Sequence, residues 1–218
     1  MLQSLLPVLI ALLVGVAIWF AWQAEKKRRA EFGAWAAEHG WRYHFRRDKH
    51  KVRQYGFLDR LQQGHSRVAS HRLEGEWQGM PAEAFQLKYV TGSGKNQQTH
   101  WWTVALVRIG TPFPELTIAP ENVLSRFGQA LGFDDIDFES IEFSNAYAVR
   151  SRDKKFAYDF CNTAMMEYLL AHRGTTLELE HDVLALLASK RLKADDLRPM
   201  LGHLAAIRER IPAYVFQD

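Results

Sequence analysis

The stretch LLPVLIALLVGVAIWFAW, residues 5–22, contains eighteen consecutive residues without a formal charge, and the rest of the chain is organised around it. A helix rises about 1.5 Å per residue, so about 18 to 20 apolar residues cross a hydrocarbon core of roughly 30 Å. Trp19 and Trp22 stand near the end of the stretch, where the aromatic belt of a membrane interface is expected. The sequence therefore predicts a transmembrane anchor over residues 1–24.

Two other interpretations of this stretch are weaker. A secretory signal peptide has a basic n-region and a small-residue cleavage site. Residues 1–4, MLQS, carry no charged side chain, and no clear site of that kind precedes the basic run. A buried core helix rarely stays apolar on all its faces for this length. We therefore expect an uncleaved single span.

The apolar stretch is followed by four cations, Lys26, Lys27, Arg28 and Arg29. Basic residues collect on the cytoplasmic side of membrane spans, so we expect a single-pass protein of the cell membrane whose C-terminal domain is cytoplasmic. The same four side chains are the candidates for contacts with anionic lipid headgroups, where each cation gains about 1 kcal/mol. A second basic run over residues 46–53 extends this basic juxtamembrane segment to residues 25–53.

The remaining residues, 54–218, suit a single domain of ordinary globular composition, since the chain is 47% hydrophobic and 24% charged. Cys161 is the single cysteine and cannot form an internal disulfide, which agrees with a reducing compartment. Residues 1–75 hold 13 Lys and Arg against 6 Asp and Glu, whereas residues 76–218 hold 15 against 19. Because this second part is acidic, we expect no binding of nucleic acid.

Strands are predicted at residues 41–45, 67–74, 83–90 and 99–109, and the loops between the last three are too short for helical crossovers, so these strands should be antiparallel. Residues 99–109 are apolar on both faces and should lie centrally. Further strands are expected at 115–119 and 146–150, with a hairpin of 176–180 and 183–189 across His181-Asp182. Helices are expected at 30–39, 120–132, 154–172 and 195–211, and one helical turn within the loop 46–64. The predicted fold is α+β, an N-terminal transmembrane helix followed by an antiparallel sheet with helices packed on it.

Familiar catalytic and metal-binding motifs are missing from the sequence. The segment Gly92-Ser93-Gly94-Lys95 lacks the spacing of a phosphate-binding loop, and a turn is the better interpretation. The nine histidines form no H-E-x-x-H pattern, and Cys161 falls beside the expected buried face of a helix. We expect neither a cofactor nor a bound metal.

The densest group of acids is Asp134, Asp135, Asp137, Glu139 and Glu142. Paired carboxylates can perform acid–base chemistry, but acids that alternate with apolar residues are more typical of the solvated side of an edge strand or an irregular segment. If the domain is an enzyme, its candidate catalytic residues are Glu121, Glu139, Glu142 and His100.

Several segments together resemble a bacterial family of single-pass, membrane-anchored proteins with a domain of uncharacterised function. They are Ala119-Pro120-Glu121, Leu131-Gly132-Phe133, residues 135–140 (DIDFES), His100-Trp101-Trp102, Met165-Met166-Glu167 and residues 211–214 (IPAY). The likeness covers most of the chain and departs slightly at Ser144-Asn145. It implies the same anchor and fold, and it implies no activity.

Three functions remain open at this point. The first is a membrane-tethered cytoplasmic module that binds or scaffolds a protein partner, because a clear anchor is joined to a domain without catalytic motifs. The second is an enzyme with a carboxylate-based site around Glu121, Glu139 and Glu142. The third is a peripheral domain that senses anionic lipids through residues 26–53.

Overall fold

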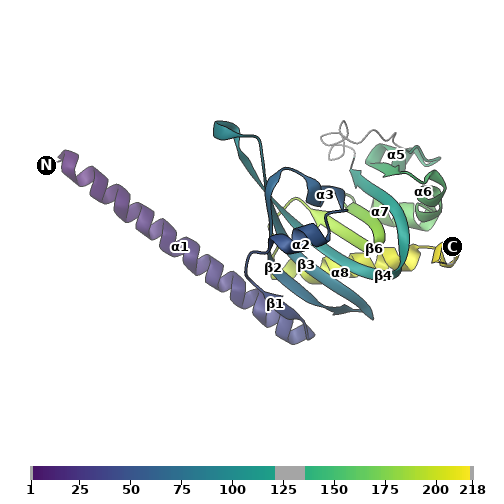
Figure 1. Cartoon of the computed structure of the whole chain (residues 1–218), viewed down its shortest axis with the longest axis horizontal. Coiled ribbons are helices and arrows are strands. Elements are labelled where there is room, and N and C mark those ends of the chain that lie inside the picture. The colour runs from purple at the N-terminus through teal and green to yellow at the C-terminus, as the bar shows by residue number, and fades with distance from the viewer. Residues whose placement is uncertain (1, 121–135, 217–218) are drawn as a thin grey trace.

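The computed structural model of the 218-residue chain describes residues 2–120 and 136–216, with side chains from residue 9 onward. A long helix, α1 (Leu2–His39), leads into an antiparallel sheet that carries helices (Figure 1). The predicted fold class is therefore confirmed. The helix expected at residues 120–132, with Glu121, lies outside the described residues.

Helix α1 is continuous from the apolar stretch to His39, whereas a separate helix was expected at residues 30–39. Residues 23–32 contain neither proline nor glycine and are rich in Ala, Glu, Lys and Arg, which favour helix, so nothing interrupts α1 after the apolar stretch. Gly40 ends the helix with a positive φ of 69°.

The sheet has six strands and is built around the long strand β4 (Gln98–Pro120). One edge of β4 pairs with β3 (Met80–Thr91) and, further along, with β5 (Tyr147–Ser151), and the other edge pairs with β6 (Thr176–Ala188). Beyond β3 follow β2 (His65–Trp77) and β1 (Arg42–His44). All pairings are antiparallel, and residues 99–109 lie centrally, as predicted.

Residues 115–119, 176–180 and 183–188 are strand as predicted, but two breaks that were expected between strands are absent. The strand expected at 115–119 is the continuation of β4, and the hairpin expected across His181-Asp182 is a single strand, β6. Both strands bend together, since the β4–β6 register shifts on either side of the Phe113↔His181 pair, and His181 has a φ of 52°. A bulge in a long strand and a hairpin turn use similar polar residues, so the sequence alone did not separate them.

The single helix predicted at 154–172 is two helices, α6 (Lys154–Phe160) and α7 (Thr163–Ala171). The side chain of Asn162 accepts a hydrogen bond from the backbone N–H of Met165 at 3.1 Å, which starts a new helix. The loop expected at 46–64 holds two short helices, α2 (Lys49–Gln54) and α3 (Asp59–Gln62). The remaining helices are α5 (Ile141–Ala146), α8 (Ala194–Arg210) and two short 3₁₀ segments, η1 (Gly94–Asn96) and η2 (Ala213–Phe216).

Helices cover both faces of the sheet. One face packs against α6, α7, α8 and the C-terminal part of α1, where Phe32 and Ala36 are 0% and 2% exposed. The opposite face packs against α2 and α3 through residues such as Tyr55 and Leu61. The segment 25–53, expected to lie between anchor and domain, thus supplies the packed part of α1, strand β1 and helix α2 to the fold itself.

Candidate functional site

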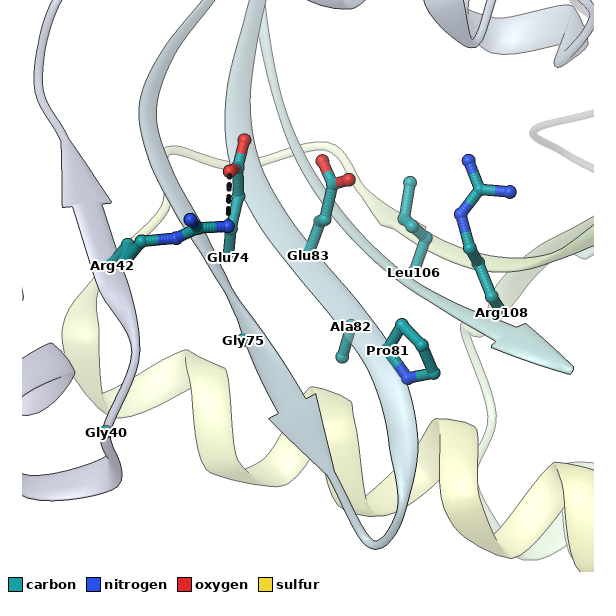
Figure 2. Close-up of a pocket in the computed structure, with 9 residues that line it drawn as sticks. All are labelled: Gly40, Arg42, Glu74, Gly75, Pro81, Ala82, Glu83, Leu106 and Arg108. Atoms are coloured by element: carbon teal, nitrogen blue, oxygen red, sulfur yellow. Dashed lines mark ion pairs between the residues drawn. The ribbon is translucent and has the colours of Figure 1, made fainter.

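A cavity of about 320 Å³ opens on the face of the sheet that carries α2, and we call it the mixed-charge pocket. Its described lining is Gly40, Arg42, Glu74, Gly75, Pro81, Ala82, Glu83, Leu106 and Arg108. Figure 2 shows four charged side chains in one row across neighbouring strands, with Glu74 and Glu83 in the middle and an arginine at each end.

Strand register creates this row. Arg42 of β1 lies opposite Glu74 of β2, and Glu74 lies opposite Glu83 of β3. Residues opposite each other on antiparallel strands share a face, so the side chains are brought together although they are far apart in sequence. Gly75 leaves room for the Trp41 ring just before β1, because a Cβ at this position would lie 2.4 Å from that ring.

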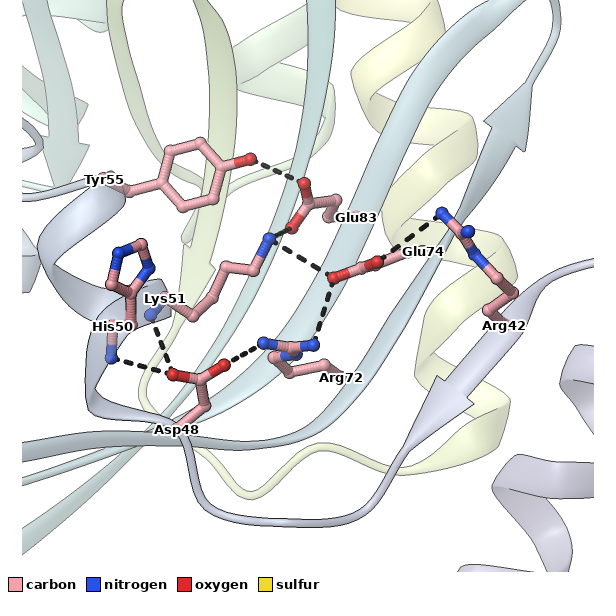
Figure 3. Close-up of polar contacts among 8 residues, drawn as sticks. All are labelled: Arg42, Asp48, His50, Lys51, Tyr55, Arg72, Glu74 and Glu83. Carbon is pink, nitrogen blue, oxygen red and sulfur yellow. Dashed lines mark hydrogen bonds and ion pairs between the residues drawn. The ribbon is translucent and has the colours of Figure 1, made fainter.

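Two glutamates directly opposite each other repel, and Lys51 of α2 compensates for this repulsion. Its Nζ lies 2.7 Å from Glu83 Oε2 and 3.3 Å from Glu74 Oε1 (Figure 3). The Lys51 side chain is only 9% exposed, so the ammonium group is almost enclosed by its partners. The hydroxyl of Tyr55 donates a second hydrogen bond to Glu83, to Oε1 at 2.7 Å.

Asp48 and Arg72 extend the network and hold α2 in place. The Asp48 carboxylate accepts hydrogen bonds from the backbone N–H groups of His50 and Lys51 and so caps α2 (Figure 3). Arg72 forms an ion pair with Asp48 and another with Glu74 Oε1 at 3.4 Å. The helix that delivers Lys51 is therefore fastened to the same strand that carries Glu74.

The electrostatics of the mixed-charge pocket favour binding over acid–base chemistry. Burial raises the pKa of Glu74, but Lys51 and Arg72 outweigh it, so the net pKa lies below the ordinary value. Burial, together with Glu83, raises the pKa of the Tyr55 hydroxyl. At neutral pH the Glu74 carboxylate is charged and the phenol is neutral, so neither is poised to exchange a proton near pH 7.

The two arginines at the ends of the row have donor capacity left. Arg108 is paired with Asp182 at 2.8 Å and is 39% exposed, while Arg42 reaches Glu74 only at 3.8 Å and is 79% exposed. Guanidinium groups carry five N–H donors each. The pocket therefore presents charged acceptors on its floor and spare donors at its mouth, an arrangement suited to a polar ligand or partner side chain.

The predicted catalytic residues are not brought together among the residues that the structure describes. Glu142 of α5 is exposed and pairs with Arg173 at 2.6 Å, and Glu139 is exposed nearby in the chain. His100 lies on β4, where Nε2 is 2.8 Å from the Thr91 hydroxyl. Helix α5 and the β3–β4 hairpin lie at different ends of the sheet (Figure 1), so Glu142 and His100, the two candidates on these elements, form no common site. Within the described ranges, no group of three or more His, Cys, Asp or Glu could hold a metal ion.

Of the four cations expected at lipid headgroups, Arg28 is used by the fold. Its guanidinium donates hydrogen bonds to Gln86 Oε1 and to the carbonyl of Leu192, each at 2.7 Å. Arg28 lies four residues before Phe32 and on the same face of α1, so it points to the sheet. Lys26 and Lys27 are exposed, and Arg29, also exposed, pairs with Glu25 at 2.9 Å.

Sequence reasoning missed the mixed-charge pocket. In the sequence Lys51 is one of several cations in a basic run, with nothing to distinguish it from the others. Three further residues, Arg42, Glu74 and Glu83, lie on three separate predicted strands and belong to no motif. The signal that unites them is strand register, which a single sequence does not reveal.

Helix α1 is the one helix in the described part of the chain that is long and apolar enough, by length and composition, to cross a membrane. None of its most apolar window is buried inside the domain. The chain therefore combines an uncovered apolar helix with an α+β domain that packs on the C-terminal part of the same helix, which is the architecture of a protein with one N-terminal membrane anchor.

Scans of family models and of curated proteins find no match to the chain. Among solved structures, the chain is similar to the crystal structure of the mycobacterial trehalose monomycolate transport factor A, TtfA. The TM-score is 0.59 at 11% sequence identity, and the match covers 84% of this chain and 92% of the TtfA chain in that crystal structure. At this identity the similarity shows the fold alone.

Proposed function

We propose that this protein is a membrane-tethered binding module, with α1 as a single span and the mixed-charge pocket as the site that receives a polar partner. One observation in particular supports the membrane tether. Along a single helix, apolar side chains such as Leu9 (56% exposed) and Ile18 (64%) are uncovered, whereas Phe32 is 0% exposed in the core. A continuous apolar surface of this size is unfavourable in water, and a bilayer covers it.

The proposed side of the membrane rests on the distribution of charge. The cations beside the apolar stretch lie on its C-terminal side, and Lys26 and Lys27 remain exposed there. This supports a cytoplasmic domain, because translocation of such a basic flank is disfavoured. The charged, nearly enclosed network at the cavity supports the binding role. Burying charged side chains costs desolvation energy that apolar side chains in the same place would not cost, so stability alone does not account for the network. TtfA is named a transport factor, which agrees with a binding role for this chain.

The tether is tested by extraction of membranes with alkaline carbonate. The full chain should stay in the membrane pellet, and a variant that lacks residues 2–24 should move to the supernatant while its domain stays folded. Release of the full chain by the same wash would contradict an integral anchor.

The orientation is tested by cysteine labelling. Lys155 is exposed on α6, and Lys155→Cys supplies one accessible thiol. The native Cys161 is 2% exposed and burial raises the pKa of its thiol, so it should stay unlabelled in the folded protein. A maleimide that does not cross membranes should label Lys155→Cys only after the cells are opened. Labelling of intact cells would place the domain outside.

The binding role is tested by a photo-crosslinking amino acid at Arg42, at the mouth of the mixed-charge pocket, with the exposed Arg198 of α8 as the control position. We expect a discrete crosslinked species from position 42 that is absent from position 198. The same products from both positions, or none from position 42 in membranes, would argue against the pocket as the binding site.

A further inference from the structure

A second cavity, of about 580 Å³, lies between helices α2 and α3 and the start of β2, and we call it the basic groove. Its described lining is Lys49, Val52, Arg53, Gly56, Leu61, Gln62, Gly64, His65, Ser66 and Arg67. Three of these residues are permanently cationic, a fourth is histidine, and none of the described lining residues is acidic. A cavity lined by charge of one sign concentrates ions of the opposite sign.

We propose that the basic groove binds a phosphate group through Lys49, Arg53 and Arg67. Two sources share this chemistry, the headgroup of an anionic membrane lipid and a small soluble phosphate. The groove lies apart from the mixed-charge pocket, and phosphate binding itself does not depend on the proposed tether, whereas the lipid source does.

Lys49 and Arg53 lie four residues apart on α2, so they are neighbours on one face of the helix. Both side chains are exposed, and neither forms an ion pair with an acid among the described residues. The neighbouring acid in the chain, Asp48, pairs with Arg72 and caps α2. Like charges at this spacing destabilise a helix, by about 0.2–0.5 kcal/mol per pair. An anion between them relieves the repulsion, which gives the free groove a preference for being occupied.

Arg67 is held in place before any ligand arrives. Its Nη1 donates to the backbone carbonyls of Leu61, at 3.3 Å, and of Gln62, at the end of α3. These bonds order the side chain and leave other guanidinium N–H groups available. A donor that is already ordered loses less conformational entropy when it binds a ligand.

The start of β2 is distorted where it borders the basic groove. Ser66 has a φ of 55°, and the β2–β3 register shifts between His65 and Val68. A bulge of this kind redirects side chains away from the regular alternation of a strand. The ring of His65 is fixed by Nε2, 3.0 Å from the carbonyl of Gly92, and by Nδ1, 3.0 Å from the Ser66 hydroxyl.

The contact between His65 and Gly92 places the basic groove beside the turn that joins β3 to β4. Figure 1 shows this hairpin extending from the domain on the side where the N-terminal half of α1 lies. In the tethered protein the groove therefore lies on the part of the domain turned to the bilayer. Residues 26–53 were expected to contact anionic lipids. Arg28 of this segment is instead bonded to the domain, but Lys49 and Arg53 of the same segment line the basic groove.

The test uses the full chain and two matched double variants. Lys49→Gln with Arg53→Gln removes two exposed cations from the groove, and Lys154→Gln with Lys155→Gln removes two exposed cations from α6. Native mass spectrometry in detergent compares retention of phosphatidylglycerol with that of phosphatidylcholine. Titration calorimetry with the protein in phosphatidylcholine nanodiscs measures affinity for inorganic phosphate and for glycerol 1-phosphate.

We expect the wild type and the α6 variant to prefer phosphatidylglycerol about tenfold, and the groove variant to lose this preference. If only the soluble phosphates bind, and the groove variant alone loses them, the proposal holds with a soluble ligand. Equal losses in both variants, or no phosphate-dependent binding by the wild type, would overturn it. A protein that binds phosphate but is released from membranes by carbonate would refute the tether and support the phosphate site. A protein that stays in the membrane but binds no phosphate would refute the phosphate site alone.

Discussion

Lys51 is the residue on which the mixed-charge pocket depends. It is the cation closest to Glu83 and also contacts Glu74, with its side chain 9% exposed. Lys51→Met would leave two neighbouring carboxylates, 19% and 18% exposed, without this partner. The cost therefore lies between that of a surface pair, about 0–1 kcal/mol, and that of a fully buried pair, about 3–5 kcal/mol. We expect a loss of that order in the free energy of unfolding, measured by urea denaturation in detergent.

The matched control for Lys51 is Lys49 on the same helix, whose side chain is exposed. Lys49→Met should change the free energy of unfolding by no more than about 0.5 kcal/mol, as is usual for surface substitutions. Equal effects of the two substitutions would mean that Lys51 does not hold the carboxylates together.

Glu178 of β6 predicts a pH dependence. It is 3% exposed, and burial raises its pKa to about 8, although the backbone N–H of Arg60 donates to it. The folded state therefore favours the protonated acid. This stabilisation is complete below about pH 4.5, the ordinary pKa of a glutamate carboxyl group, and is lost as the pH rises through 8. The free energy of unfolding should fall by roughly 2–4 kcal/mol from pH 5 to 8.5, since a tenfold change in proton affinity is worth about 1.4 kcal/mol.

Glu178→Gln keeps the shape and hydrogen-bonding oxygen of the side chain but cannot ionise. The variant should lose most of the difference between pH 5 and pH 8.5 in denaturation experiments. Glu142→Gln, at an exposed position, should keep the wild-type difference. An unchanged pH dependence in Glu178→Gln would assign it to other groups.

At the scale of elements, the joint between α1 and the sheet is made by Arg28 as well as by apolar packing. Arg28→Met removes the donor to the Leu192 carbonyl and one of the donors to Gln86, which also accepts from the backbone N–H of Leu192. A buried acceptor left without a partner costs about 1–3 kcal/mol. We expect faster amide hydrogen exchange in residues 25–39 and a corresponding loss in the free energy of unfolding.

Arg29 is the matched control for Arg28, one position along the same helix. Its ion pair with Glu25 at 2.9 Å lies on the surface, where such pairs contribute about 0–1 kcal/mol. Arg29→Met should therefore leave exchange in residues 25–39 close to that of the wild type. Faster exchange in both variants would indicate a general effect of charge near the bilayer.

Elements with a strong local pattern were predictable from the sequence. The central strand 99–109 is apolar on both faces, and the last helix, expected at 195–211, has its apolar residues at helical spacing, so burial follows directly. Errors arose where a local signal has two structural meanings. Asn162 caps a new helix inside an apparently continuous one, and His181 marks a bulge that resembles a turn.

The site could not be predicted because it depends on long-range pairing. The row from Arg42 through Glu74 to Glu83 requires the register of three strands, and Lys51 reaches it from a helix predicted as loop. What the sequence did supply was the charge itself, since the basic runs and their position beside the apolar stretch were apparent. Which of those cations face the protein and which face solvent was decided by packing, as Arg28 illustrates.

For the whole molecule, the consequence of a continuous α1 is rigid coupling between the apolar half of the helix and the domain. A flexible linker would let the domain rotate freely, whereas an unbroken helix fixed by Phe32 and Arg28 gives the mixed-charge pocket and the basic groove constant positions relative to the apolar segment. Spin labels at Val16→Cys in α1 and Ser93→Cys in the β3–β4 turn report on this directly. Cys161 is buried and should not be labelled.

In nanodiscs, pulsed electron paramagnetic resonance should give one narrow distance distribution between the two labels. Four alanines inserted after Ala24 lengthen the helix by about 6 Å and turn it by about 40°, so the distribution should move but stay narrow. Four glycines at the same place add the same chain length and weaken the helix by about 1 kcal/mol per residue relative to alanine, so the distribution should broaden. A broad distribution in the uninterrupted chain would mean that the domain is not oriented by α1, and that any preference of the pocket or groove for the membrane side must come from contacts of the domain itself.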